Sequence, residues 1–177
     1  MMDARYALDA MRDTDWAKVR AIYVEGIDTG NATFEIEAPD WDAWDAAHLP
    51  FCRLVARRGD AIIGWAALSP VSRRRVYAGV AEVSVYVAGM AQGKGVGRAL
   101  LARLISESER AGIWTLQSTI LAENAISVAL HTSMGFREVG RRERIGQRHA
   151  VWRDVILMER RSRIVGCDDG ADKPPII

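Results

Sequence analysis

The sequence predicts a single α/β (α+β) domain, and three observations lead to this expectation. The chain has 177 residues, a length that suits one domain with one apolar core. Apolar residues recur at helical spacing in some segments and alternate with polar residues in others. Two apolar runs, 51–56 and 61–68, flank a turn at 57–60 that contains Gly59, which predicts an antiparallel hairpin.

The first third of the chain is expected to contain a strand and two helices before that hairpin. Alternation over 5–12 predicts the strand, and the Asp-Thr-Asp sequence at 13–15 offers N-caps for the first helix. The segment 26–33 is expected to be a loop. A second helix is expected after Pro39, with Asp40 as its cap.

The middle third contains the clearest strand and the clearest helix. Residues 81–87 alternate so that Glu82, Ser84 and Tyr86 lie on one face of a strand and the valines lie on the other. A glycine-rich loop follows. Apolar residues at helical spacing then predict a helix over 96–112.

The last third is expected to complete the domain. Its predicted elements are a strand, a helix, a short strand and a final strand, over 114–121, 124–134, 136–140 and 149–158. Residues 1–163 are expected to form the domain. The segment 164–177 is expected to be a flexible tail, because most of it is rich in Asp, Gly and Pro and lacks periodicity.

The composition excludes several classes of protein. Lys and Arg number 24 against 23 Asp and Glu, so the net charge of +1 gives no general attraction to nucleic acid or to an anionic membrane. No apolar run approaches the roughly 20 residues of a membrane span, and the N-terminus lacks a secretory signal pattern, so we expect a cytoplasmic protein. Cys52 and Cys167 match no metal-binding spacing, so we expect neither a disulfide nor a metal.

The segment 92–98 (Gln-Gly-Lys-Gly-Val-Gly-Arg) is expected to bind an anion such as a diphosphate. It lies between an apolar strand and an amphipathic helix, where backbone N–H groups and the helix dipole converge. The P-loop pattern fails because Gly95 stands where that pattern needs a hydroxyl residue. The dinucleotide-binding pattern fails because the glycine spacing differs and the loop lies in mid-chain. A plain glycine turn that starts a helix is the remaining alternative.

The pattern Gln-x-x-Gly-x-Gly, formed by Gln92, Gly95 and Gly97, resembles the acetyl-CoA signature of the GNAT superfamily of N-acetyltransferases. More narrowly, the chain resembles the phosphinothricin or methionine sulfone N-acetyltransferases over about residues 5–160. The segments that carry this resemblance are Ala-Glu-Val-Ser-Val-Tyr-Val at 81–87, Glu-Asn-Ala-Ile-Ser at 123–127, Leu-His at 130–131 and Gly-Phe at 135–136.

This resemblance implies a fold, a cofactor and an assembly. The fold would be the GNAT architecture, a mixed and mostly antiparallel central sheet flanked by helices, opening beside strand 81–87. The co-substrate would be acetyl-CoA, with no metal, and the protein would be a homodimer. The residues expected to bind acetyl-CoA are Val85, Tyr86, Val87, Gln92, Gly93, Lys94, Gly95, Val96, Gly97, Arg98, Asn124 and Ser127.

Three residues are candidates for acid–base catalysis. Acetyl transfer to an amine needs a base to remove a proton from the ammonium group, and Glu82 is the candidate, because partial burial would raise the pKa of its carboxyl. The alternatives for Glu82 are a solvated carboxylate or an arginine partner. His131 stands where many superfamily members carry a tyrosine that protonates the leaving thiolate, but it is also consistent with a packed residue. His149 matches a histidine near the amine site of the narrower family, or is an ordinary strand residue.

Substrate contacts are expected from the arginine run and from one aromatic residue. Arg73, Arg74 and Arg75 offer guanidinium groups that can clamp a carboxylate or a phosphinate, or they form a solvated turn. No RNA-binding motif accompanies them. The residues assigned to substrate binding are Phe34, Arg73, Arg74, Arg75, Val83 and Ser84.

The expected reaction is transfer of the acetyl group from acetyl-CoA to the amino group of a small acidic amino-acid-like substrate. Phosphinothricin, methionine sulfone and methionine sulfoximine are the examples that the resemblance implies. The alternatives are acetylation of a polyamine, an aminoglycoside or a protein N-terminus, and a non-catalytic acyl-CoA-binding sensor. The arginine run favours a small anionic substrate over a polycation.

Overall fold

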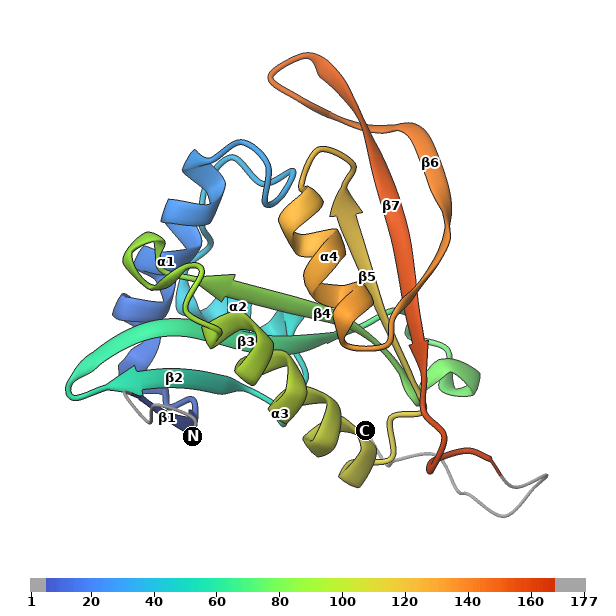
Figure 1. Cartoon of the computed structure of the whole chain (residues 1–177), viewed down its shortest axis with the longest axis horizontal. Helices are drawn as coiled ribbons and strands as arrows, with labels where there is room; N and C mark the ends of the chain where they lie inside the picture. Colours follow the sequence, from blue (N-terminus) through green and yellow to red (C-terminus); the bar gives the residue numbers. More distant parts are fainter. Residues whose placement is uncertain (1–5, 168–177) are drawn as a thin grey trace.

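The computed structural model describes residues 6–167, which form one mixed sheet of seven strands flanked by helices (Figure 1). The sheet order is β1-β2-β3-β4-β5-β7-β6, and every neighbouring pair is antiparallel except β4 and β5. The strands are β1 (Ala7–Ala10), β2 (Leu54–Arg58), β3 (Ala61–Pro70), β4 (Val80–Val87), β5 (Thr115–Leu121), β6 (Arg137–Arg148) and β7 (Val151–Arg161). The helices are α1 (Trp16–Asp28), α2 (Trp41–Ala47), α3 (Val96–Arg110) and α4 (Ala125–Ser133). The predicted α/β class and mostly antiparallel sheet are confirmed.

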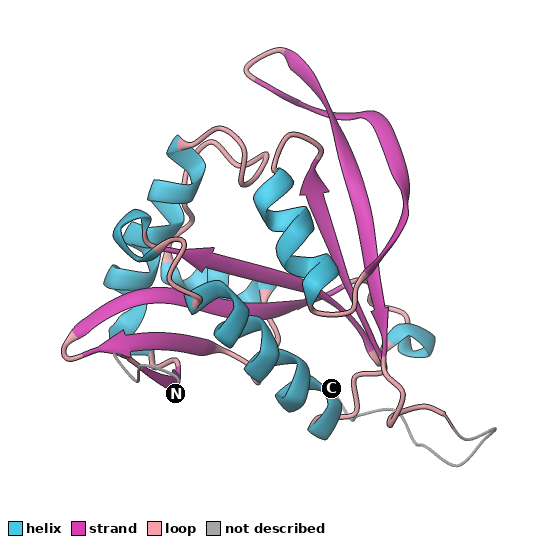
Figure 2. Cartoon of the chain, in the orientation of Figure 1, coloured by secondary structure: helices cyan, strands magenta, loops and turns pink. Residues whose placement is uncertain are grey.

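Helices cover both faces of the sheet (Figure 2). On one face Tyr23 of α1 and Trp44 of α2 pack edge-on against Trp65 of β3, with ring centroids 5.7 and 5.8 Å apart. On the other face α3 lies so close to β3 that a Cβ added to Gly64 would be 3.0 Å from the Leu100 side chain. Figure 1 shows α3 and α4 in front of the sheet and α2 behind it. Within residues 6–167, no helix is long and apolar enough to cross a membrane.

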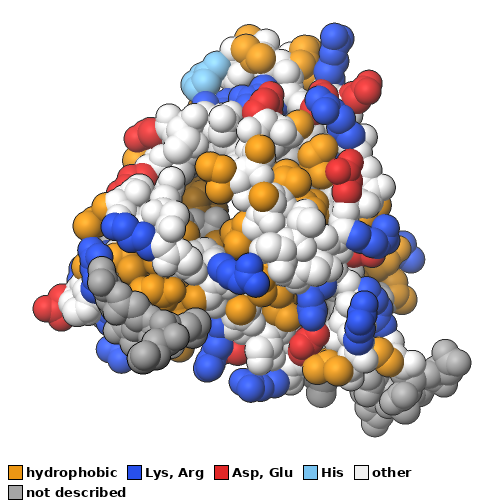
Figure 3. All heavy atoms as spheres, viewed as in Figure 1, with side chains coloured by type: hydrophobic (Ala, Val, Ile, Leu, Met, Phe, Trp, Pro, Cys, Tyr) orange, Lys and Arg blue, Asp and Glu red, His pale blue; other side chains and the backbone are white. Residues whose placement is uncertain are grey.

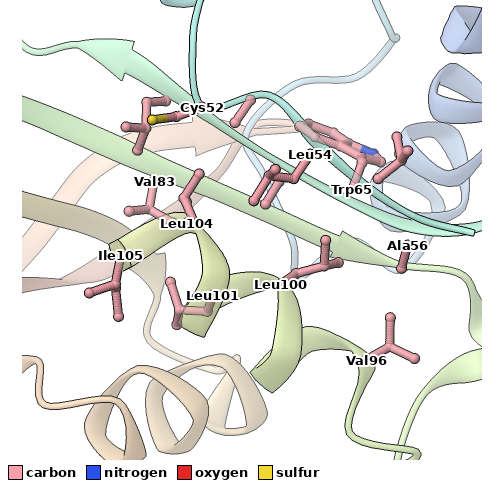
Figure 4. Packing of buried hydrophobic residues seen from close by; sticks show 14 of the residues in the cluster. Cys52, Leu54, Ala56, Trp65, Val83, Val96, Leu100, Leu101, Leu104 and Ile105 are labelled. Atoms are coloured by element: carbon pink, nitrogen blue, oxygen red, sulfur yellow. The ribbon is translucent and has the colours of Figure 1, made fainter. Parts of the chain in front are cut away.

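The apolar core lies on both faces of the sheet, and Figure 4 shows the part between α3 and the centre of the sheet. Leu100, Leu101 and Leu104 of α3 are fully buried, and Leu104 lies beside Val83 of β4 in the close view. Burial of each such side chain stabilises the fold by about 1.5–3 kcal/mol relative to exposure. The core therefore holds β4 and the start of α3 in a rigid frame.

Strands β4 and β5 pair only where they begin. The last pair in their register joins Glu82 to Gln117, and no later pair follows in the described chain. Both strands continue, because β4 pairs with β3 as far as Val87 and β5 pairs with β7 as far as Leu121. Figure 1 shows the two strands diverging from their common start. We call the opening between them the wedge.

Helix α1 is longer than the sequence predicts. The predicted loop begins at Gly26, whereas α1 continues to Asp28. A Cβ added to Gly26 would be 2.7 Å from two ring carbons of Tyr86. This glycine therefore allows the helix to pack against an aromatic ring and does not mark the helix end.

The hairpin of β6 and β7 also differs from its prediction. The predicted short strand 136–140 is wrong, because β6 runs to Arg148. No residue of β6 is fully buried, so this edge strand lacks the alternating pattern that predicts a strand. Strand β7 begins at Val151 and not at 149, because His149 and Ala150 form the turn, with φ of 49° and 61°.

Most of the predicted tail, 164–177, lies outside the described residues. Its first residues are tied to the end of β7, since the N–H groups of Ile164 and Val165 both donate to Ser162 Oγ at 3.1 Å. Residues 168–177 are not described, so the tail stays a prediction.

Candidate active site

The wedge offers unpaired backbone edges. From Val83 to Val87, β4 pairs with β3 alone, so the N–H and C=O groups on its other side are available to a ligand that adds like an extra strand. Val85, Tyr86 and Val87, which are predicted to bind the cofactor, lie on this edge. Figure 3, in the view of Figure 1, shows a hollow near the centre of the molecule, between α4 and the loop that follows α1.

The glycine-rich loop presents N–H groups at the start of α3. The first hydrogen bond of the helix runs from Ala99 N–H to Gly95 O at 3.0 Å, so the N–H groups before Ala99 have no helical acceptor. Gly93 and Gly95 have φ of 70° and 80°, and a Cβ on either would meet nothing within 4 Å. Val96 is buried, whereas Arg98 is exposed. The loop can therefore approach a phosphate closely.

The other loop residues have local structural contacts. Lys94 Nζ donates to Met90 O at 2.7 Å, and Gln92 Nε2 donates to Val87 O at 3.4 Å. A Cβ added to Gly97 would lie 3.4 Å from side chains of β4 and α4. The packing of α3 therefore has room for a Cβ at Gly97, and this glycine has no positive φ, unlike Gly93 and Gly95.

Glu82 lies at the vertex of the wedge. It is half-buried, and its Oε2 accepts a hydrogen bond from Gln117 Nε2 at 3.2 Å. Its partner on the neighbouring strand β3 is Ser69. No Lys or Arg of the described chain forms an ion pair with Glu82, which removes the arginine-partner alternative. Its carboxylate is therefore held by an amide group and has no paired cation among the described residues.

A groove of about 420 Å³ runs beside Glu82 on the α1–α2 face of the sheet. Ser69 and Ser84, both neighbours of Glu82, line it together with residues of α1, α2 and the connection between them. Its aromatic lining residues are Tyr23, Trp44, Trp65 and Tyr86. Glu82 is not itself a lining residue of this groove, but it lies at the vertex of the wedge and next to two residues that line the groove.

Two tyrosines of the groove form a packed cluster with a tryptophan. The ring of Tyr86 stacks on Trp65 at 4.7 Å and meets Tyr23 edge-on at 4.9 Å. Burial raises the pKa of both tyrosine hydroxyls. Both phenols therefore stay protonated at neutral pH.

Helix α4 holds the remaining predicted cofactor residues and one buried histidine. Asn124 Oδ1 accepts from Ser127 N–H at 3.1 Å, and Asn124 Nδ2 donates to Asn31 O at 3.1 Å. His131 is 3% exposed and its Nδ1 lies 2.8 Å from Ser127 O, so Nδ1 carries the proton. His131 Nε2 is buried and has no partner in the described residues. Burial lowers the pKa of His131, which favours the neutral ring.

The arginine run and Val83 lie away from the groove. Arg73, Arg74 and Arg75 are exposed on the connection between β3 and β4, and the Arg74 guanidinium lies 5.6 Å from the Tyr77 ring. The Val83 side chain faces α3, on the opposite face of β4 from Ser84 (Figure 4). Of these predicted substrate residues, only Ser84 lines the groove.

The loop after α1 is fastened by the β6–β7 hairpin. Arg153 donates to Gly30 O at 3.1 Å and to Asn31 Oδ1 at 2.8 Å, and it also pairs with a carboxylate of the β5–α4 turn. Phe34 packs on the hairpin, because a Cβ added to Gly146 would be 2.8 Å from its ring. His149 is exposed in the hairpin turn. Phe34, which is predicted to contact the substrate, therefore contacts the hairpin and does not line the groove.

The family of the chain follows from a comparison with known proteins. Residues 14–136 match the Acetyltransferase (GNAT) family. The chain belongs to this family. It is an acetyl-CoA-dependent N-acetyltransferase.

Named relatives and solved structures agree with this assignment. The acetyltransferase is 35% identical to a phosphinothricin N-acetyltransferase of Alcaligenes faecalis, over 85% of this chain and 79% of the relative. It is 31% identical to an L-methionine sulfoximine/L-methionine sulfone acetyltransferase of Salmonella typhimurium, over 82% and 88%. A GNAT superfamily phosphinothricin acetyltransferase from Sinorhizobium meliloti, solved in complex with AcCoA, is similar with a TM-score of 0.83, 29% identity and coverage of 96% and 93%.

Several residues of the acetyltransferase's groove were not predicted from the sequence. Gln117 orients Glu82, and Glu35, Glu37 and His48 line the groove. No pattern in the sequence marks them, because they come from the loop after α1, the end of α2 and β5. Only the pairing of strands brings these segments together.

Proposed function

We propose that this acetyltransferase acetylates the amino group of a small amino-acid-like acid, of the class that contains phosphinothricin, methionine sulfone and methionine sulfoximine. The observation that carries the proposal is the place of Glu82, at the vertex of the wedge and next to Ser69 and Ser84 of the groove. The named activities of the relatives in A. faecalis and S. typhimurium support this class. The run 73–75, just before β4, supplies guanidinium groups for the acid group of such a substrate.

The wedge and the glycine loop fit acetyl-CoA. The open backbone at Gly93 and Gly95 would hold the pyrophosphate, and the free edge of β4 at 85–87 would pair with the pantetheine arm. When bound, acetyl-CoA supplies the thioester carbon that the amine attacks. Asn124 and Ser127 belong to the proposed set through the family resemblance, and their contacts with each other cap α4.

Glu82 is the general base in the proposed reaction. An alkylammonium group has a pKa near 10, so it must lose a proton before it attacks. Gln117 holds one oxygen of Glu82, and the carboxylate takes the proton directly or through one water. The neutral amine then forms the new C–N bond as the C–S bond breaks.

His131 and His149 have weaker support than Glu82. His131 could protonate the leaving thiolate only as an imidazolium, and burial lowers the pKa of that ring. His149 is exposed in the hairpin turn and enters the proposed set through the resemblance alone. The proposal also includes a homodimer, which size-exclusion chromatography tests.

A panel of amines tests the proposed function. Thiol release from acetyl-CoA is measured with the three named amino acids, a polyamine, an aminoglycoside and a peptide with a free N-terminus. Faster turnover of the amino acids supports the proposal, and faster turnover of any other amine overturns it. A rise in melting temperature with acetyl-CoA but no amine-dependent thiol release would identify a non-catalytic sensor.

A further inference from the structure

The groove beside Glu82 carries negative charge that nothing in it balances. Glu35 and Glu37 line it, and among its described lining residues there is no Lys or Arg. Neither glutamate forms an ion pair with the described part of the chain. Acidic side chains on the walls of a concave site raise the local concentration of cations.

His48 adds a fixed hydrogen-bond acceptor to the same groove. Its ring stacks on Trp44 at 4.1 Å, and its Nδ1 lies 2.7 Å from Trp44 O. Because a carbonyl can only accept, Nδ1 carries the proton and Nε2 keeps a free lone pair. Burial lowers the pKa of His48, so the ring stays neutral at pH 7. His48 is therefore an acceptor whose position does not depend on the two glutamates.

The aromatic residues of the groove give it a rigid wall. Trp44 and Trp65 are each 1% exposed, because Trp44 stacks on His48 and Trp65 stacks on Tyr86. The Arg53 guanidinium also lies 5.2 Å from the Trp44 ring centroid, so the charge in the groove comes from the two glutamates alone. Arg53 itself is tied to Asp45, and it is not a lining residue of the groove.

We infer that the groove binds a cationic, hydrogen-bond-donating end of the substrate, with a guanidinium group as the best match. The inference rests on the proposed function, because it places the reacting amine at Glu82. Along β4, Ser84 and Tyr86 extend from Glu82 into the groove, whereas the run 73–75 lies beyond the opposite end of the strand. An α-amino acid can thus direct its carboxylate to the arginines and its side chain to the acidic groove.

This arrangement predicts that members of the proposed substrate class differ in how well their side chains suit the groove. A side chain that ends in an anion, as in phosphinothricin, would meet two glutamates. A methionine sulfoximine side chain is uncharged and offers an N–H donor. L-arginine offers a charged planar group with several N–H donors, which suits the carboxylates and His48 Nε2.

The test compares L-arginine with L-citrulline, which has nearly the same shape and no charge, and with L-glutamate. Acetylation at pH 7.5 is followed by thiol release, and the product is identified by mass spectrometry. We expect kcat/KM for L-arginine to exceed that for L-citrulline by about tenfold. L-Glutamate should be the poorest substrate.

A double variant, Glu35→Gln with Glu37→Gln, isolates the charge of the groove. It should lower kcat/KM for L-arginine about tenfold and leave L-citrulline within about twofold. Glu138→Gln is the matched control, because Glu138 is exposed on β6 and does not line the groove. His48→Phe keeps the aromatic stack but removes the acceptor, and it should slow both substrates.

The outcomes separate the inference from the proposed function. Equal rates for all three amino acids, or no effect of the double variant on L-arginine, overturn the inference and leave the proposed function intact. Agmatine is L-arginine without its carboxylate. If agmatine alone is acetylated and the double variant slows it, the proposed substrate class fails and the groove assignment stands. If acetyl-CoA binds but none of these compounds is acetylated, both fail.

Discussion

The two faces of β4 offer different groups to a ligand. The face toward α3 is apolar and closely packed, and the cofactor contacts proposed there are backbone groups of the glycine loop and of the strand edge. The face toward α1 and α2 carries Glu82, Ser84 and Tyr86, and its groove is built from side chains. We therefore expect substitutions on the first face to act through backbone geometry, and those on the second to act through charge and hydrogen bonds.

The largest expected effect is on the polar face. Glu82→Gln keeps the size of the side chain but removes the base, so turnover at pH 7 should fall by roughly 10² to 10⁴. The defect should shrink as pH rises toward the pKa of the amine, because free amine then forms without the enzyme. Acetyl-CoA affinity and melting temperature should stay close to those of the wild type. Wild-type turnover at neutral pH would remove Glu82 from the mechanism.

Gly95→Ala tests the backbone face, with Gly59→Ala as its control. Both glycines have positive φ, 80° and 58°, and a Cβ on either meets nothing within 4 Å. Each substitution should therefore cost a similar strain, about 1–2 kcal/mol of unfolding free energy. Only Gly95→Ala should also weaken acetyl-CoA binding, measured by calorimetry. Equal cofactor affinity in the two variants would mean that the loop does not hold the pyrophosphate.

The buried histidine on α4 makes stability depend on pH. Burial lowers the pKa of His131 in the folded state, so between that value and the unfolded pKa of about 6.5 the unfolded chain binds more protons. The stabilisation is fully present above pH 6.5 and is lost as pH falls. Urea unfolding of the wild type and of His131→Phe between pH 5 and 7.5 should show a smaller loss at low pH in the variant. Parallel pH curves for the two proteins would contradict this.

Gly97→Ala should have the smallest effect. A Cβ at this position would lie 3.4 Å from the nearest side chains, an ordinary contact, and alanine favours a helix by about 1 kcal/mol over glycine. We expect the unfolding free energy to change by no more than about 1 kcal/mol and acetyl-CoA affinity to be nearly unchanged. A large loss of affinity would show that Gly97 belongs with Gly95 in the phosphate cradle.

The difference between local and long-range contacts explains which elements could be predicted from the sequence. The predicted second helix is confirmed with its cap, because Asp40 Oδ1 accepts from Ala43 N–H at 2.9 Å, and this contact is local. The glycine loop is likewise one continuous segment. The predicted β6 was too short because an exposed edge strand needs no alternation of apolar and polar residues. The helix end predicted at Gly26 was wrong because this glycine contacts Tyr86 of β4, which is distant in the sequence. Local contacts leave a pattern in the sequence, whereas long-range contacts do not.

The residues of the candidate site likewise include some that the sequence could predict and some that it could not. Glu82 could be proposed as the general base from the pattern of strand 81–87 and from the family resemblance. The acidic wall of the groove could not, because Glu35 and Glu37 are exposed residues of an irregular connection, with no periodicity to distinguish them. Their significance depends on Ser69, Ser84 and the aromatic rings beside them, which lie far away in the sequence.

The position of β7 between β5 and β6 has a consequence for how the protein matures. Strand β7 is synthesised after β5 and β6, yet it lies between them in the sheet, and its Arg153 fastens the loop after α1. A nascent chain that ends before Val151 therefore leaves one edge of β5 open and β6 without its neighbour. Such pairings between distant segments form slowly and expose the chain to aggregation until they close. Only a chain that already contains Val151–Arg161 can pair this edge of β5 and fasten the loop after α1.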